Sequence, residues 1–351
     1  MRCRFIQFLP GIQVHWAINE TLWGSRGYDV ITSSDSGQNW TRVTTIPAGF
    51  LHRFLARIGP LRRLLRLDIR SYLQLSDHGF IVFCNADIFL WRQGDTQPHR
   101  IGRVRRGRGP LLQGCCQDDK GNCYYGEYWR NPEHEEVNVY TWKRGANDWK
   151  LFYSLPPGTI RHIHAVQFDP VSRNIWIAAG DHDNECRIGY FEASSSPHLV
   201  TIASGKQMAR AVSLLFTTDY VYWGSDGGRG TSVTANYIYR WCRSTKNIEE
   251  IAKVGGPVYY STKDQKGRMF VSTTVEGGAS ESDRFARLWM SVDGMTWSEI
   301  GQWKKDRWPF IFGYGVLSFP RGLPSKSRLF VTASGVQGSP GTWAFEPEEI
   351  N

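Results

Sequence analysis

Short stretches rich in β-branched and aromatic residues follow one another along the chain, separated by clusters of Gly, Asp, Asn and Pro. The stretch at 162–168 is a clear case, because a polar turn at 169–174 and a second apolar stretch at 175–179 follow it. Short apolar runs bounded by turn residues predict β-strands rather than helices. The pattern recurs at intervals of roughly 45–50 residues, a spacing typical of the blades of a β-propeller.

The repeating unit predicts four antiparallel strands, and the chain contains seven such units. They begin near residues 1, 72, 111, 160, 211, 258 and 315. Seven units in 351 residues correspond to roughly 50 residues per blade. The sequence therefore predicts an all-β fold, a single seven-bladed β-propeller domain over 1–351, with six blades as an open alternative. The last unit lacks an evident fourth strand, and we expect a strand near residues 4–8 to supply it and close the ring.

One segment, residues 48–70, breaks this pattern. Its apolar residues recur at helical spacing, with six arginines between them. Gly59 and Pro60 would interrupt any single helix there. A basic amphipathic segment of this kind can lie on an anionic membrane surface, or it can be a helical insert that packs its apolar face on the propeller. We favour the packed insert.

The net charge of +9 arises from two arginine-rich patches. Residues 50–70 and 103–108 together contain ten arginines against one acidic residue, Asp68. The remainder of the chain is balanced, which argues against a nucleic-acid partner. No apolar stretch reaches the roughly 18–20 residues of a membrane span, and the N-terminal apolar run is too short for a secretory signal. We expect a cytoplasmic protein, or an exported one whose signal is missing from this sequence.

The cysteines indicate a reducing compartment. Seven are present, an odd number without a C-x-x-C pair, which does not suggest a disulfide framework. Cys116 and Cys123 flank a predicted turn and could face each other across a hairpin. We favour buried thiols over a bond between them.

The sequence S-x-D-x-G-x-x-W occurs once in full, at Ser33, Asp35, Gly37 and Trp40, and a shorter variant lies at Ser291, Asp293 and Trp297. The Asp carboxylate of such a turn accepts local backbone N–H groups, and the Trp packs the turn on its neighbouring strand. The pair of motifs resembles the Asp-box (BNR repeat) superfamily of β-propellers, which includes sialidases, other glycoside hydrolases and some polysaccharide lyases. The resemblance implies that these residues are structural and that the chemistry lies elsewhere.

The resemblance to a propeller places the loops that precede first strands and follow second strands on one face. Polar and aromatic side chains gather in those loops, as expected of a carbohydrate site. The predicted catalytic residues are His162, His164 and Tyr128. The predicted substrate-binding residues are Arg130, Arg229, Glu127, Asp181, Asp183 and Trp129. We expect His162, His164, Tyr128, Arg130, Asp181 and Arg229 to line one pocket at the mouth of the central channel, on the face opposite Asp35 and Asp293.

Three functions remain open on these residues. A lyase that cleaves an acidic, uronate-containing polysaccharide by β-elimination needs a base and a cation, which histidine or tyrosine and arginine could supply, as in some Asp-box lyases. A glycoside hydrolase needs two carboxylates, for which Glu127, Asp181, Asp183 and Glu185 are candidates. A non-catalytic propeller that binds a glycan or a protein is the third. We expect no cofactor and no metal, because no third ligand beside His162 and His164 is evident from spacing.

Overall fold

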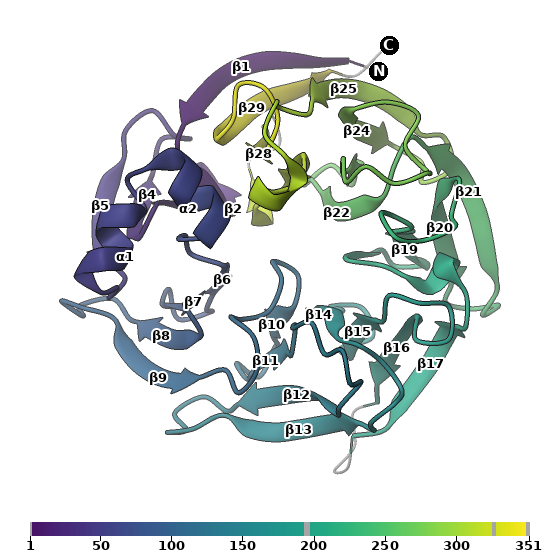
Figure 1. Ribbon diagram of the computed structural model, residues 1–351, viewed down its shortest axis with the longest axis horizontal. Helices are drawn as coiled ribbons and strands as arrows, with labels where there is room; N and C mark the ends of the chain where they lie inside the picture. The colour runs from purple at the N-terminus through teal and green to yellow at the C-terminus, as the bar shows by residue number, and fades with distance from the viewer. Residues whose placement is uncertain (1, 193–196, 325–327, 349–351) are drawn as a thin grey trace. The chain divides into compact units, whose positions relative to one another are not determined.

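The computed structural model describes residues 2–192, 197–324 and 328–348. In this part of the chain the strands form seven sheets, six with four strands and one with five. The fold is an all-β, seven-bladed propeller, as the sequence predicts (Figure 1). The chain divides into two compact units, residues 1–68, 226–238 and 250–351 in the first and residues 69–225 and 239–249 in the second. The expectation of a single domain stays a prediction.

The second unit contains three complete sheets, each a run of four consecutive antiparallel strands. The first sheet comprises β6 (Ser71–Gln74), β7 (Phe80–Cys84), β8 (Asp87–Trp91) and β9 (His99–Arg103). The next comprises β10 (Cys115–Gln117), β11 (Cys123–Gly126), β12 (Val137–Trp142) and β13 (Lys150–Leu155). The third comprises β14 (Ile163–Phe168), β15 (Ile175–Ala179), β16 (Arg187–Phe191) and β17 (Leu199–Ser204).

A fourth run of strands follows the short 3-10 helix η1 (Gln207–Ala209). It comprises β18 (Leu214–Phe216), β19 (Tyr220–Gly224), β20 (Asn236–Cys242) and β21 (Ile248–Val254).

The first unit contains three sheets, of which two depart from four consecutive strands. The regular sheet comprises β22 (Val258–Lys263), β23 (Met269–Thr273), β24 (Phe285–Ser291) and β25 (Ser298–Lys304). The five-stranded sheet comprises β2 (Gln13–Asn19), β3 (Thr21–Arg26), β4 (Asp29–Ser33), β5 (Thr41–Thr45) and β27 (Arg321–Pro324). Here β27 pairs parallel with β2, a pairing that the sequence pattern does not predict.

The remaining sheet joins the two ends of the chain. Its order is β1 (Arg2–Pro10), β29 (Gly341–Glu348), β28 (Leu329–Ser334) and β26 (Val316–Ser318). The N-terminal strand pairs antiparallel with β29 over its whole length, with Arg2 opposite Glu348 and Pro10 opposite Gly341. The prediction that an N-terminal strand completes the last unit is therefore confirmed.

Apolar side chains pack between neighbouring sheets within each unit. Phe83 of β7 contacts the rings of Tyr125 and Trp149 from the next sheet. Aliphatic residues such as Ile163 and Ile177 continue the core between the following two sheets. Burial of these large side chains on both faces explains why the inner strands read as nearly continuous apolar runs.

The two Asp-box turns connect third and fourth strands, β4 to β5 and β24 to β25. In the first turn, the Ser33 hydroxyl donates to Asp35 Oδ1 at 2.7 Å, and the Asn39 amide donates to the same oxygen at 2.9 Å. Gly37, at φ +92°, donates its amide to Ser33 Oγ, and the Trp40 indole donates to the Gly37 carbonyl. The hydrogen bonds expected of the motif are present.

The shorter turn has similar hydrogen bonds to its Asp carboxylate with one residue fewer, but the indole nitrogen of Trp297 has no hydrogen-bond partner in the described part of the chain. Ser291 Oγ donates to Asp293 Oδ1 at 3.0 Å, and the Thr296 amide donates to that oxygen at 2.8 Å. Gly294, at φ +75°, is the residue with positive φ, and Trp297 is buried. The expected position of Asp35 and Asp293 relative to the histidines stays a prediction.

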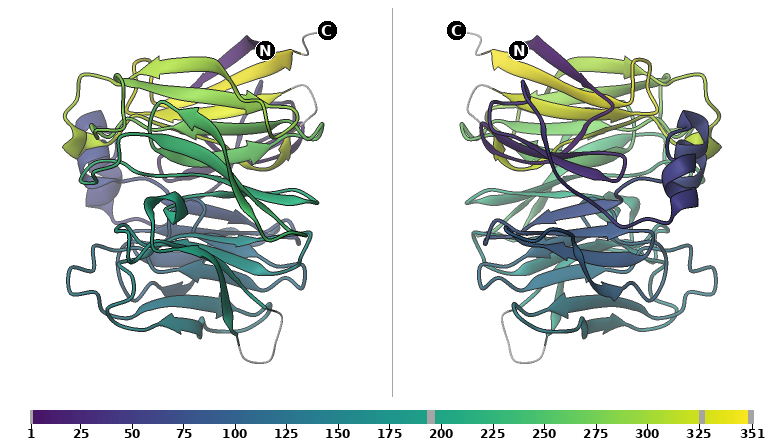
Figure 2. Two further views of the ribbon diagram at one scale, coloured as in Figure 1. Left: turned by 90° about the vertical axis from the view of Figure 1, so that its right-hand side faces the viewer. Right: turned by 90° about the vertical axis from the view of Figure 1, so that its left-hand side faces the viewer.

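The insert forms two short helices, α1 (Phe50–Leu55) and α2 (Gly59–Leu65), which are separated near Gly59 and Pro60 as the sequence predicts. Neither helix contains a buried residue. α2 is held beside the 3-10 helix η2 (Phe310–Phe312), where Arg63 pairs with Asp306 at 2.7 Å and donates to the Phe312 carbonyl (Figure 2). The prediction of a packed apolar face is wrong, because polar contacts hold α2 at η2 and most apolar side chains of the insert are exposed, although Leu55 and Leu61 are half-buried.

All seven cysteines lie in described residues, none of them forms a disulfide, and five of them are buried. Cys123 lies opposite Gln117, and Cys116 lies opposite Tyr124, so the two thiols do not face each other across the hairpin. The preference for buried thiols over a Cys116–Cys123 bond is confirmed. No described helix is long and apolar enough to cross a membrane.

Candidate functional site

His162 directly precedes β14 and His164 is its second residue, and both side chains are almost fully buried. Alternate residues of a strand share a face, and the two rings do lie together, with centroids 4.8 Å apart. The pairing of β14 with β15 shifts between Ile163 and Ala165, so His164 occupies a bulge. Bulges re-aim side chains and are common beside active sites.

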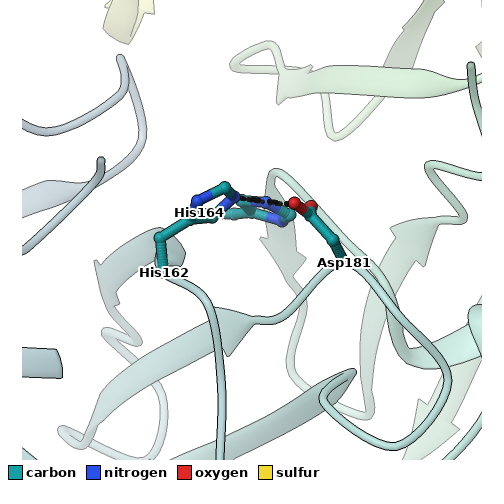
Figure 3. Close-up of side chains that lie close together, drawn as sticks. All are labelled: His162, His164 and Asp181. Atoms are coloured by element: carbon teal, nitrogen blue, oxygen red, sulfur yellow. Dashed lines mark hydrogen bonds and ion pairs between the residues drawn. The ribbon is translucent and has the colours of Figure 1, made fainter. Parts of the chain in front are cut away.

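Asp181 reaches the two histidines from the end of β15. Gly180 precedes it at φ +87°, and a Cβ there would meet the backbone of Glu185 at 2.4 Å, so the turn requires glycine. The Gly180 amide donates to the His162 carbonyl, which fixes the loop on the strand. Asp181 Oδ1 lies 3.4 Å from His162 Nε2 and 3.2 Å from His164 Nε2 (Figure 3).

The two imidazoles also approach each other directly. Their Nε2 atoms are 2.9 Å apart. On the opposite edge of each ring, His162 Nδ1 lies 2.8 Å from the Trp129 carbonyl and His164 Nδ1 lies 3.2 Å from the Ala211 carbonyl. A carbonyl only accepts, so both Nδ1 atoms bear hydrogen and donate. Each neutral ring then presents a lone pair at Nε2, towards the other ring and Asp181.

Two arginines pair with the same carboxylate. Arg210 Nη2 lies 3.3 Å from Asp181 Oδ1, and Arg161 Nη1 lies 3.7 Å from Oδ2. Burial opposes ionisation of Asp181, but hydrogen bonds and charge from His162 and His164, when these rings are protonated at Nε2, outweigh it and hold the pKa of Asp181 below its usual range. Burial lowers the pKa of His164, against the bond to Asp181.

Tyr128, Trp129 and Arg130 follow β11 and lie beside the histidines. The Tyr128 ring centroid is 4.3 Å from that of His162 and 6.1 Å from that of His164, and the Arg70 guanidinium lies 5.5 Å from the Tyr128 ring. Trp129 stacks under Arg106 at 4.9 Å. Arg130 is exposed and makes no ion pair among the described residues. The Tyr128 ring and the Trp129 carbonyl therefore contact His162, whereas the Arg130 side chain is exposed to solvent.

The other predicted carboxylates differ in environment. Glu127 is buried, its Oε2 accepts the Asn138 amide at 3.0 Å, and its Oε1 has no hydrogen-bond partner. Burial raises the pKa of Glu127. Glu185 is also buried and accepts from His134 and from the Arg161 amide, so it holds the loop after β15. Asp183 is exposed in that loop and is not part of the histidine cluster.

Arg229 belongs to the first unit, where its amide contacts Glu276 and its guanidinium lies 6.0 Å from the Phe310 ring. Its place in a shared pocket stays a prediction. Sequence reasoning missed Arg161, Arg210 and Arg70. Arg161 directly precedes His162 and could have been included with it, whereas Arg210 and Arg70 carry no local signal.

Comparisons with known proteins support the fold and do not identify a family. No family model and no curated protein matches the chain. An oligogalacturonate lyase from Vibrio parahaemolyticus is similar at a TM-score of 0.62 and 9% identity, with 98% of this chain and 93% of that one covered. The protein YCF48 bound to the D1 peptide is similar at 0.59 and 11% identity, with 99% and 95% covered.

A third similar structure is the extracellular domain of a one component system from B. thetaiotaomicron, with a TM-score of 0.60 and 11% identity. The alignment covers 99% of this chain and 40% of that protein, so this chain spans less than half its length. At these identities the likeness shows the fold alone. The chain is a β-propeller similar in fold to an oligogalacturonate lyase and to YCF48.

Proposed function

We propose that this propeller cleaves an acidic, uronate-containing polysaccharide by β-elimination, at the site around Asp181. One observation carries the proposal: a half-buried tyrosine lies on a pair of buried histidines, whose carboxylate partner is flanked by arginines. Titratable groups whose pKa values are shifted by burial and by charged neighbours cluster at functional sites. Fold likeness to an oligogalacturonate lyase agrees with the proposal without deciding it.

Elimination requires a cation at the uronate carboxylate and a base at the carbon beside it. Arg161 suits the first role, because its side chain is 32% exposed and its pair with Asp181 is long at 3.7 Å. Arg130 is exposed and can add a second contact. Arginine binds carboxylates in bidentate fashion, and neutralising that charge stabilises the carbanion-like transition state.

Tyr128 is the base that a substrate can reach. Both nitrogens of His164 are committed, Nδ1 to a carbonyl and Nε2 to the cluster, and its side chain is buried. Tyr128 is only half-buried, and the Arg70 guanidinium lies 5.5 Å from the centroid of its ring. In its phenolate form Tyr128 takes the proton, the carbon–oxygen bond to the leaving sugar breaks, a double bond forms, and the phenol returns the proton to the leaving oxygen.

The contacts of the carboxylates at this site are less suitable for hydrolysis than for elimination. A hydrolase needs one protonated and one ionised carboxyl open to the sugar. Glu127 has the raised pKa of an acid, but its Oε1 is buried and its Oε2 accepts the Asn138 amide. Asp181 is bonded to the histidines and arginines. These contacts favour elimination over hydrolysis.

The test is incubation of the protein with a panel of uronate-containing polysaccharides, with absorbance of the unsaturated product as the readout. Tyr128→Phe is expected to lower kcat at least about 100-fold with little change in binding. Arg130→Ala and Arg161→Ala are expected to raise KM about tenfold, the loss of one charged contact. Arg144→Ala, on an exposed turn, is the control.

The outcomes separate the alternatives. New reducing ends without the absorbance would overturn elimination in favour of hydrolysis, with Glu127→Gln and Asp181→Asn as the next variants. No product with any polysaccharide would overturn cleavage and leave a binding propeller. His164→Ala is expected to reduce turnover as well, because it removes a ring on which Tyr128 packs.

A further inference from the structure

We propose that His162, His164 and Asp181 bind a divalent transition-metal ion, through the two Nε2 atoms and Oδ1. These are the ligand atoms that the described part of the chain brings together, all within 4.8 Å of one another. The inference does not depend on the polysaccharide proposed above, because its test measures the ion itself. Three lines of geometry support it.

The spacing of the three atoms fits a common metal ion. An ion about 2.1 Å from three ligands holds them about 3.0 Å apart at right angles and about 3.4 Å apart at tetrahedral angles. The observed separations are 2.9 Å between the imidazoles, 3.2 Å from His164 to Asp181 and 3.4 Å from His162 to Asp181. They lie close to these values or between them, and one ion can therefore contact all three (Figure 3).

The chemistry of the three atoms calls for a cation. Both Nδ1 atoms donate to carbonyls, so each neutral ring offers only a lone pair at Nε2. With the Asp181 oxygen, three electron-rich atoms meet in a buried place and repel one another unless positive charge lies among them. One proton on one imidazole can reach two of the atoms, whereas a metal ion satisfies all three at once.

The hydrogen-bond partners that orient the three ligand side chains are of the kinds found in known metal sites. A histidine that binds metal usually donates its other nitrogen to a carbonyl or carboxylate, which fixes the ring and its tautomer. The Trp129 and Ala211 carbonyls do this for His162 and His164. Asp181 is oriented by Arg161 and Arg210. Since Arg210 contacts the same oxygen at 3.3 Å, it competes for the carboxylate, and we expect moderate rather than very tight binding.

The ligand set favours manganese, iron, cobalt, nickel or zinc over calcium or magnesium. Imidazole nitrogen suits the first-row transition metals, whereas calcium and magnesium prefer oxygen ligands. Three protein ligands leave at least one coordination position for water or for an anionic ligand.

The experiment measures metal content of the full chain, prepared without a polyhistidine tag. The protein is stripped with a chelator, incubated with Mn²⁺, Co²⁺ or Zn²⁺, passed through a desalting column and analysed by mass spectrometry of the element. About one ion per chain is expected, and the melting temperature should rise by about 5 °C at saturating metal. His164→Gln and Asp181→Asn should each retain at least tenfold less metal.

His15→Gln is the matched control, because His15 is equally buried and hydrogen-bonds to Ser25, but it is not part of the cluster of His162, His164 and Asp181. It should retain the ion. Absence of the ion from the wild-type protein, or equal retention in all variants, would overturn the proposal. Circular dichroism identifies a variant that fails to fold, and the melting shift of the wild-type protein with metal then decides the question without that variant.

A second, independent observation concerns the insert, and we infer that it docks on an anionic lipid surface. Most apolar side chains of α1 and α2 are exposed, with Phe50 at 86%, Leu51 at 65% and Phe54 at 51%. Trp308 and Ile311, at 43% and 71%, extend the surface around η2, on which α2 is held. Contiguous exposed apolar side chains of this size mark an interaction site.

The charges around this surface identify its partner. Arg53, Arg57 and Arg66 are exposed and form no ion pair among the described residues. Arg63 is committed to Asp306, and Arg62 lies 3.7 Å from Asp68. Aromatic and aliphatic side chains interleaved with unpaired arginines on short helices are typical of elements that lie in the plane of a membrane. Phe50, Leu51 and Phe54 would enter the lipid boundary while the arginines contact headgroups.

Sedimentation with vesicles tests this surface. The protein should co-sediment with vesicles that contain phosphatidylserine and should stay in the supernatant with vesicles of phosphatidylcholine alone. High salt should release the protein from the phosphatidylserine vesicles. Arg53→Glu with Arg57→Glu, and separately Phe50→Ser with Leu51→Ser, should each weaken binding at least tenfold. Arg26→Glu with Arg42→Glu changes the charge equally at exposed positions of the same unit and should not. Equal pelleting of all variants, or none of the wild-type protein, would overturn the inference; binding to a protein partner without vesicle binding would do so too.

Discussion

Asp169 and Arg243 form a bidentate ion pair, with Arg243 Nη1 2.7 Å from Asp169 Oδ2 and Nη2 3.0 Å from Oδ1. Asp169 is fully buried in the turn after β14, and it also accepts from the Val171 amide and the Ser172 hydroxyl. Arg243 follows β20 and donates as well to the Thr217 carbonyl. The pair connects the turn after β14 to the residue that follows β20, and both residues belong to the second unit.

Arg243→Met is expected to lower the free energy of unfolding by about 3 kcal/mol, because it leaves the Asp169 carboxylate buried without its counter-ion. Urea-induced unfolding measures the change. Arg100→Met is the control, since the Arg100–Asp87 pair is open to solvent, with side chains 55% and 30% exposed, and its loss should cost less than about 1 kcal/mol. Equal losses in the two variants would contradict the role given to the buried pair.

His15 should make the stability depend on pH. Burial, with a smaller effect from Arg321, lowers the pKa of His15 to about 3, so the folded state keeps the ring neutral. In the unfolded chain it titrates near pH 6.5. The associated stability is complete above about pH 6.5 and is lost as the pH falls towards 3, by about 3 kcal/mol between pH 7 and pH 4.

The measurement is urea-induced unfolding at a series of pH values. His15→Gln should show a shallower decline in the free energy of unfolding than the wild-type protein. His99→Gln, at a largely exposed position, should follow the wild type. A decline of the same steepness in His15→Gln would show that other groups cause it.

Cys242 should be the most reactive thiol near neutral pH. Hydrogen bonds from Ser244 and Thr245 lower the pKa of Cys242 to about 7, whereas burial raises the pKa of Cys186 to about 12. The thiolate is the nucleophile, so alkylation of Cys242 by iodoacetamide should rise through pH 7 and precede that of Cys186. Peptide mass spectrometry gives the rates. Ser244→Ala should move the rise to higher pH, and an unchanged profile would contradict the assigned cause.

Asp35 should stabilise its turn only when ionised. The amide of Asn39, followed by the Ser33 hydroxyl, lowers the pKa of Asp35 to about 2. A lowered pKa means that the stabilisation is present above about pH 4 and is lost as the pH falls towards 2. Asp35→Ala should melt at a lower temperature than the wild type at pH 7, and the difference should vanish near pH 2. Asp148→Ala, at an exposed position, should show no such pH-dependent difference.

The sequence by itself determined the blades. Strands such as β14 and β15 follow from local apolar runs and turn residues, and the Asp-box turns follow from Ser, Asp and Gly at fixed spacing. The break between α1 and α2 follows from Gly59 and Pro60. Each of these features depends on residues close together in the chain, so the pattern of the sequence is sufficient to predict it.

Only the tertiary structure decided which side chains meet. Asp181 was predicted beside the histidines, but the convergence of three acceptor atoms depends on a bulge at His164 and a positive φ at Gly180. Arg210, which follows η1, contacts Asp181 although the two residues are far apart in sequence. Similarly, β27 pairs with β2 although most of the chain separates the two strands in sequence. Exposure of Phe50 and Leu51 likewise depends on what packs on α1. Long-range pairing and burial are settled by the whole fold, because no local pattern records which distant surfaces come together.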